Sequence, residues 1–176
     1  MNRKKRIYLL LAMLGCFMFP LIGCIKDSDE SVAQKKLGQL VSAIEEKDAE
    51  RLRSLFAKSK INDISTFEQT ATDLFAYLDE PIVSVSKHGP GVNASKTGGN
   101  TFKYFQMSNV ISTSNKTFRI AVYICEIDTA NSENVGIWSL YIINKEHDIK
   151  TDYFYWGDNL WTPGINVGIP GVYPED

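Results

Sequence analysis

The thiol of Cys24 is the side chain whose surroundings point most clearly to a chemical reaction. The chain opens with a basic cluster at residues 3–6, continues with the apolar run Ile7–Phe19, and reaches LIGC at residues 21–24. From Lys26 onward the sequence is charged. A basic start, an apolar segment of about 7–15 residues and small residues at a cut site are typical of a secretory signal. The pattern therefore predicts an exported chain that is cut close to Cys24.

The motif Leu21-Ile22-Gly23-Cys24 resembles the lipobox of bacterial lipoproteins. The resemblance implies that diacylglycerol alkylates Cys24 and that residues 1–23 are removed as a lipoprotein signal peptide. Residues 24–30 would then be the lipidated cysteine and a short polar tether. The membrane would be the first partner of the chain, which we expect to be lipid-anchored at the cell membrane and to face the extracytoplasmic side.

An uncleaved membrane helix is the alternative for this segment. Residues 7–25 carry no charge, and as a helix they would span about 28 Å, close to the thickness of the hydrocarbon core. Pro20 would break such a helix near its end. We therefore prefer the lipoprotein interpretation.

The other reactive groups are isolated. Cys16 lies in the leader, so Cys125 is left alone in an apolar run, where a buried and unreactive thiol is expected. His88 and His147 lack the close spacing that a metal site needs. The glycine-rich stretch 89–97 has Pro90 and Ser95 where a phosphate-binding loop needs glycine, so we read residues 88–100 as a flexible connection. We expect neither a metal nor another cofactor.

Aromatic and cationic side chains of the predicted strands and tail are the candidates for a pocket or binding surface. They are Tyr104, Arg119, Tyr123, Tyr141, Trp156 and Trp161. Tyr and Trp join a large contact area to a polar group, so an exposed patch would suit a partner protein, a glycan or an extended peptide. Alternatively, these rings fill the core, the tail covers a sheet edge, and Arg119 faces solvent.

Three helices are predicted in the first half of the chain. Apolar residues recur at helical spacing over 29–47, and Asp48 is placed to cap a second helix. Ser65 and Glu68 form a capping box that would begin a third helix, which Pro81 ends.

Five strands are predicted to follow, joined by short polar turns, and we expect them at 81–86, 101–112, 116–128, 135–146 and 149–156. Strands so close in sequence favour an antiparallel meander. Strand 116–128 is apolar on both faces and should be central. The sequence predicts an α+β domain over 31–156, with three N-terminal helices on a curved antiparallel sheet of about five strands, and a Gly/Pro-rich tail at 157–176.

The segment LVSAIEEKDAERLRSLFAKS (40–59), followed by a third helix and a meander, resembles the nuclear-transport-factor-2-like fold. The whole chain also resembles small uncharacterised lipoproteins of Gram-positive bacteria that carry such a domain. The resemblance implies a cone whose curved sheet and helices enclose a pocket. Relatives use this pocket for isomerisation, dehydration, ligand binding or protein docking, so the fold alone does not fix the function.

Charge narrows the possible partners. The leader carries four of the 19 Lys and Arg residues, so its removal takes the formal charge from −2 to −6. An acidic chain without a basic patch is a poor match for nucleic acid. We expect a non-enzymatic module that binds an envelope protein or a small ligand. An isomerase or dehydratase that uses the cone pocket, and an immunity-type lipoprotein that docks a toxin, are the alternatives.

Overall fold

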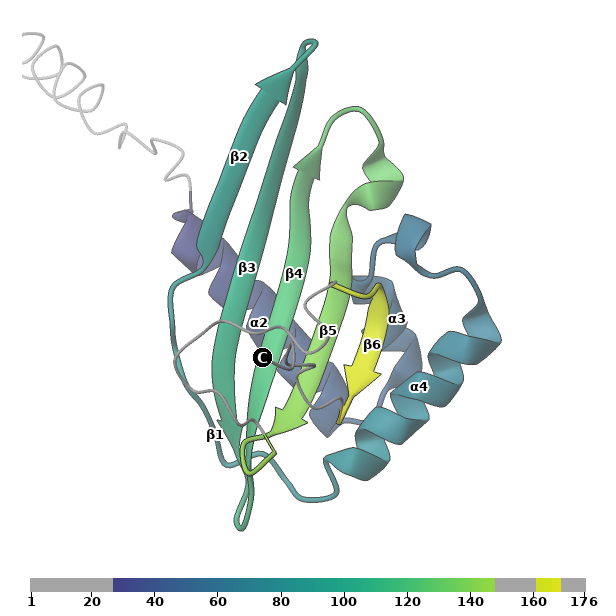
Figure 1. The fold of residues 1–176 in the computed structure, drawn as a ribbon, viewed down its shortest axis with the longest axis vertical. Helices are drawn as coiled ribbons and strands as arrows, with labels where there is room; N and C mark the ends of the chain where they lie inside the picture. Colours follow the sequence, from purple (N-terminus) through teal and green to yellow (C-terminus); the bar gives the residue numbers. More distant parts are fainter. Residues whose placement is uncertain (1–26, 148–160, 169–176) are drawn as a thin grey trace, which may run out of the picture.

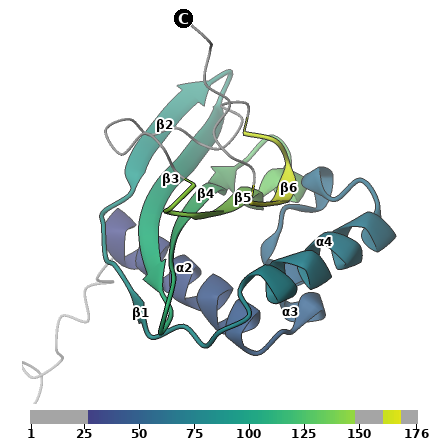
Figure 2. The ribbon, with the colours of Figure 1, turned by 60° about the horizontal axis from the view of Figure 1, so that its bottom comes forward.

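The computed structural model describes residues 27–147 and 161–168, which form three α-helices and a six-stranded curved sheet (Figure 1). The helices are α2 (Asp29–Glu45), α3 (Ala49–Leu55) and α4 (Ile64–Tyr77), with short 3-10 helices η1 (Lys58–Lys60) and η2 (Ser132–Asn134). The strands are β1 (Ser84–Val85), β2 (Gly91–Thr97), β3 (Asn100–Ser112), β4 (Thr117–Asp128), β5 (Gly136–Asn144) and β6 (Gly164–Val167). Figure 2 shows the three helices on one side of the sheet. The α+β class is confirmed.

The sheet is mixed, so the prediction of a purely antiparallel sheet was wrong. Its order is β1-β3-β4-β5-β6, and β2 also pairs with β3. β1, β2 and β4 each run antiparallel to β3, and β5 runs antiparallel to β4. β6, by contrast, runs parallel to β5. A parallel neighbour needs a connection of about a dozen residues or more, and residues 145–163 supply that length. The predicted strand 149–156 lies outside the described residues.

The stretch predicted as a flexible connection contains a strand. Residues 91–97 pair with 100–106 of β3 without a register shift. The turn between them is Gly98-Gly99, and both residues have positive φ (59° and 81°). Two such residues form the type I′ turn that suits the twist of a hairpin, and glycine adopts it without strain. The strand predicted at 81–86 is shorter in the structure, where β1 covers only Ser84–Val85.

A single large apolar core joins the helices to the inner face of the sheet, meaning the face toward the helices. Leu37 and Leu40 of α2 and Leu74 of α4 are buried against Phe105 and Ile120 of the sheet. Phe56 and Phe67 meet edge to face, with ring centroids 5.0 Å apart. β4 lies in the middle of the sheet and is covered on both faces, as its apolar pattern predicted.

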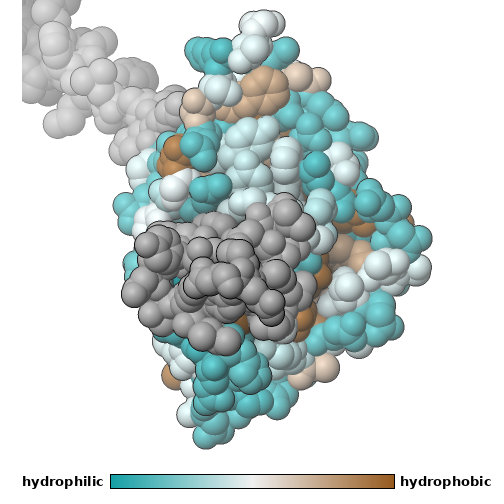
Figure 3. All heavy atoms as spheres, viewed as in Figure 1, coloured by the Kyte–Doolittle hydropathy of each residue, from teal (hydrophilic) through white to brown (hydrophobic). Residues whose placement is uncertain are grey.

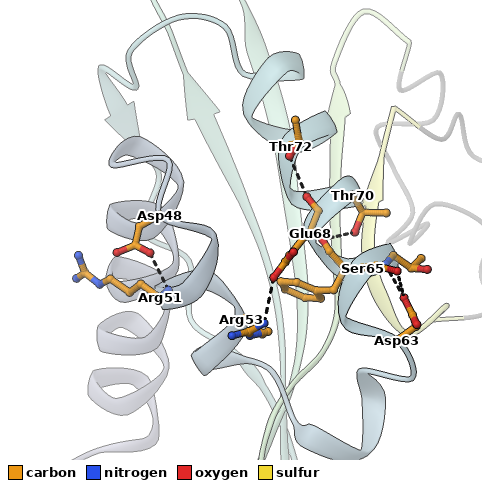
Figure 4. A network of polar contacts seen from close by, with 10 residues as sticks. Asp48, Arg51, Arg53, Asp63, Ser65, Glu68, Thr70 and Thr72 are labelled. Carbon is orange, nitrogen blue, oxygen red and sulfur yellow. Dashed lines mark hydrogen bonds and ion pairs between the residues drawn. The ribbon is translucent and has the colours of Figure 1, made fainter.

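Each described α-helix begins at a side-chain cap. Ser28 caps α2, so that helix starts inside the predicted tether. The Asp48 carboxylate accepts a hydrogen bond from the Arg51 amide at 2.9 Å, which confirms the predicted cap of α3. The capping box was wrong: the Asp63 carboxylate accepts from the Thr66 amide at 2.7 Å and caps α4 (Figure 4). Ser65 donates its hydroxyl to the same carboxylate.

The α4 cap should make stability depend on pH. Hydrogen bonds from Ser65 and Thr66 lower the pKa of Asp63 below its ordinary value of 3.8. A lowered pKa in the folded state means that the stabilisation is complete above pH 3.8 and is lost as the pH falls through the folded-state value. Asp63→Asn keeps a capping oxygen that does not titrate.

Urea unfolding at pH 7 and at pH 3 tests this cap. We expect Asp63→Asn to lose less stability than the wild type on acidification. Equal losses in the two proteins would show that Asp63 does not carry this dependence.

Candidate functional site

Five rings gather on the outer face of the sheet, the face turned away from the helices. This aromatic cluster consists of Tyr104 of β3, Tyr123 of β4, Trp138 and Tyr141 of β5, and Trp161 at the entry to β6. Side chains alternate along a strand, so Phe105 and Ile124 point into the core while Tyr104 and Tyr123 point outward. In Figure 3, which views this face, pale residues of near-neutral hydropathy lie over the upper strands.

The rings pack around Tyr123. The Tyr104 ring is stacked on it at 5.6 Å between centroids, and the Trp138 ring stands at 88° to it at 5.6 Å. Trp161 lies 4.9 Å away on a tilted plane. Offset stacked and edge-to-face pairs at these distances each stabilise by about 0.5–1.5 kcal/mol beyond the area that they bury.

Trp138 is the member of the cluster that the sequence did not reveal. Strict alternation along β5 would turn it inward with Leu140 and Ile142. The register shifts here, because Tyr123 pairs with Ser139 whereas Ile124 pairs with Ile137. Trp138 is the extra residue of this bulge, and the bulge turns its ring outward. Its indole N–H donates to the Asn134 carbonyl at 2.6 Å, which fixes the ring.

Trp161 is held in the cluster by β5. Its φ of 53° is unusual for a residue other than glycine. The Ser139 hydroxyl donates to the Trp161 carbonyl at 2.7 Å, and the Tyr141 hydroxyl accepts from the Thr162 amide at 2.5 Å. Trp161 also packs on Ala121, Tyr141 and Ile143, a small second core.

The electrostatics of the cluster favour neutral phenols beside a cation. Burial raises the pKa of Tyr104 and of Tyr123, so both hydroxyls stay protonated at neutral pH. Neither hydroxyl has a hydrogen-bond partner within the described ranges. The Lys60 ammonium of η1 lies 4.1 Å from the centroid of Trp138, a cation–π contact. The cluster thus offers ring edges, two donor hydroxyls and a positive charge.

The structure places the six candidate residues differently. Tyr104, Tyr123, Tyr141 and Trp161 come together in the aromatic cluster. Arg119 lies on the same face but further along β4, where its guanidinium donates to the Ser108 hydroxyl at 3.3 Å. Trp156 and Cys24 lie outside the described residues.

An open cleft of about 680 Å³ lies on the helical side, between α3, η1 and the η2 turn. Its lining includes the apolar Phe56 and Ile61 and charged residues of both signs. Arg53 of α3, one of the lining residues, forms an ion pair with Glu68 of α4 at 3.2 Å (Figure 4). The cleft is open to solvent.

Cys125 and His88 are the next side chains of the described ranges to place. Cys125 is buried, and desolvation raises the pKa of its thiol to about 11, so the thiolate is scarce at neutral pH. The Nδ1 atom of His88 lies 3.0 Å from the hydroxyl oxygen of Ser86. No group of three or more His, Cys, Asp or Glu residues in these ranges is placed to hold a metal ion.

No helix within 27–147 and 161–168 is both long and apolar enough to cross a membrane. No curated protein matches the sequence. A family model described as "Domain of unknown function (DUF5104)" matches residues 39–145, which run from the middle of α2 to the end of β5. This match covers more than half of the chain, so the protein belongs to the DUF5104 family.

Proposed function

We propose that the protein is an extracytoplasmic lipoprotein whose nuclear-transport-factor-2-like domain is a non-enzymatic binding module. In this proposal Cys24 carries the lipid, and the aromatic cluster is the binding surface for an envelope protein or a small ligand. The order of helices followed by a curved sheet supports the cone-like fold. The leader and its cysteine support the anchor.

The anchor would hold the domain close to the membrane. Only residues 25–28 separate Cys24 from the first residue of α2. The five Cα–Cα steps from Cys24 to Asp29 reach about 18 Å at most when fully extended. The start of α2 would therefore lie close to the membrane surface.

The aromatic cluster is the observation that carries the binding proposal. Tyr104, Tyr123, Trp138 and Trp161 are half-buried, so each ring retains exposed surface. Tyr and Trp are enriched at binding sites because their rings contribute large contact area with few rotatable bonds. The space between sheet and helices is packed with apolar side chains, which favours the outer face over an interior pocket as the binding surface.

The charges near the rings favour binding over acid–base catalysis. Asp128 is the acidic residue whose charge acts on Tyr104. Its carboxylate accepts hydrogen bonds from the amides of Ala130 and Asn131 and from the Asn134 side chain. These bonds lower its pKa, and a carboxylate so engaged is a poor general base.

Photocrosslinking in intact cells tests the binding surface. A photoreactive residue at Gln106, which pairs with Tyr123 on the outer face, should capture a partner. The same residue at the exposed Gln69 of α4 is the control and should capture much less. Adding Trp138→Ala should lower the yield at Gln106 at least about tenfold, as for a central aromatic anchor.

Circular dichroism melting should show that the Trp138→Ala variant is folded. Equal yields at Gln106 and Gln69, or a yield at Gln106 that Trp138→Ala does not change, would contradict the proposed surface.

A further inference from the structure

Among the described strands β2 is an edge strand, because β3 is the only one of them that pairs with it. It pairs with β3 and lies off the main strand order of the sheet. All seven of its residues are exposed, and Figure 1 shows it along the margin of the sheet, in a hairpin that extends beyond β4. An edge of this kind is a template on which another extended chain can add hydrogen bonds.

The hairpin turn fixes which backbone groups face outward. Thr97 and Asn100 flank the two-residue turn and pair directly, so they exchange both backbone hydrogen bonds. Hydrogen-bonded pairs alternate with non-bonded pairs along an antiparallel ladder. Val92, Ala94 and Lys96 are therefore the residues whose amide and carbonyl groups point away from β3. Every second residue of β2 thus presents one amide donor and one carbonyl acceptor along the edge.

β2 lacks most of the features that block such an edge. Natural edges are protected by proline, by bulges or by several charges. The seven residues of β2 include no proline, their register with β3 has no shift, and Lys96 is their one charge. The side chains on the outer face are small, since Gly91, Asn93 and Ser95 lie there, and Asn93 is directly opposite Tyr104.

The charge around β2 is positive in an otherwise acidic protein. No Asp or Glu occurs in the sequence between Glu80 and Glu126, a span that contains β1, β2 and β3. Lys103 and Lys116 in this span are paired with Asp29 and Asp79. Lys96 lies in β2 and Lys87 four residues before the strand begins; both are exposed, and neither has an ion-pair partner within the described ranges.

We propose that the free edge of β2 binds an extended, acidic segment of a partner protein by strand addition. The partner's backbone pairs with the outward groups of Val92, Ala94 and Lys96, and its carboxylates meet Lys87 and Lys96. This surface goes beyond the aromatic cluster and depends neither on it nor on the lipid anchor.

A designed peptide tests the edge directly. The probe is the capped heptapeptide acetyl-Glu-Val-Thr-Tyr-Thr-Val-Glu-amide. Its length equals that of β2, which has seven residues. Calorimetric titration of the full-length chain in detergent micelles should show saturable one-to-one binding. Ala94→Pro removes an outward amide without breaking the ladder to β3, and it should weaken binding at least about tenfold. Ala94→Val keeps the amide and should bind as the wild type does.

Two further probes separate backbone pairing from charge. A peptide N-methylated at alternate residues should not bind, because it cannot extend the ladder. The double variant Lys87→Glu/Lys96→Glu should weaken binding of the acidic peptide about tenfold and improve binding of a peptide with Lys at both ends. Thermal melting should confirm that each variant folds.

Other occupants of the edge give different results. Unchanged binding to Ala94→Pro, or no saturable binding of the heptapeptide, would overturn the proposal. A dimer in sedimentation that Ala94→Pro converts to a monomer would assign the edge to a second copy instead. Binding to phosphatidylglycerol vesicles that the lysine variants abolish, without peptide binding, would assign it to the membrane. Crosslinking at Gln106 tests the aromatic cluster separately and should not respond to Ala94→Pro.

Discussion

Gly136→Ala should destabilise the protein by about 4 kcal/mol or more, a large part of the roughly 5–15 kcal/mol that keeps a domain folded. Gly136 has φ of 133°, a conformation that residues with a side chain rarely adopt. A Cβ atom there would lie 2.5 Å from the Ala57 amide nitrogen and 2.8 Å from the Phe56 carbonyl carbon. Both contacts are with backbone, so no flexible side chain can move aside.

The close approach of Phe56 and Ala57 to Gly136 also joins the end of α3 to β5. Phe56 forms a parallel bridge with Ile137, and the Ala57 amide donates to the Ile137 carbonyl at 2.9 Å. Separating these segments would break that bond and disturb the neighbouring bulge at Trp138. We therefore expect Gly136→Ala to loosen the aromatic cluster as well as the core.

Urea unfolding of Gly136→Ala beside Gly38→Ala tests this contact. Gly38 is exposed in α2, and a Cβ there meets no atom within 4 Å. Its replacement should stabilise the helix by about 0.5–1 kcal/mol. A Gly136→Ala variant that unfolds at the same urea concentration as the wild type would show that the Phe56–Ile137 contact is not maintained in solution.

Cys24→Ser should abolish lipidation completely. Two acyl chains give a lasting anchor, because each buried methylene contributes about 0.8 kcal/mol. A serine hydroxyl offers no thiolate for alkylation, so the variant should carry no lipid and should retain residues 1–23. Cys16→Ser changes the cysteine inside the leader and should leave both lipidation and cleavage intact.

The mass of the intact protein is the measurement for the anchor, because an uncleaved apolar leader could hold the chain at the membrane by itself. The wild type should begin at Cys24 and carry the added mass of the diacylglyceryl group. Native protein with residues 1–23 attached and a free Cys24 thiol would contradict the proposed anchor.

Local patterns in the sequence determined much of the architecture. The long strands β3, β4 and β5 follow from runs of β-branched and aromatic residues, and the helical spacing of Leu37 and Leu40 predicted the inner face of α2. The Asp48 cap and the burial of Cys125 were also predicted correctly. Each of these depends on residues close together in the chain.

Choices between competing local signals were decided by the surroundings. Ser65 and Glu68 fit a capping box, yet Asp63 caps α4 and Glu68 pairs with Arg53 of α3 instead. Residues 91–97 have a composition typical of loops, yet they form β2, because the Gly98-Gly99 turn places them beside β3. In both cases a contact with another element outweighed the local preference.

The sequence by itself identified four of the five rings of the aromatic cluster, since Tyr104, Tyr123, Tyr141 and Trp161 were candidates from their residue types and strand positions. Only the tertiary structure decided that they meet, that Trp138 joins them, and that β6 runs parallel to β5. The period of a strand fixes which residues alternate, but a one-residue bulge reverses the face of a side chain, and the partner of a strand is chosen by contacts far away in the sequence.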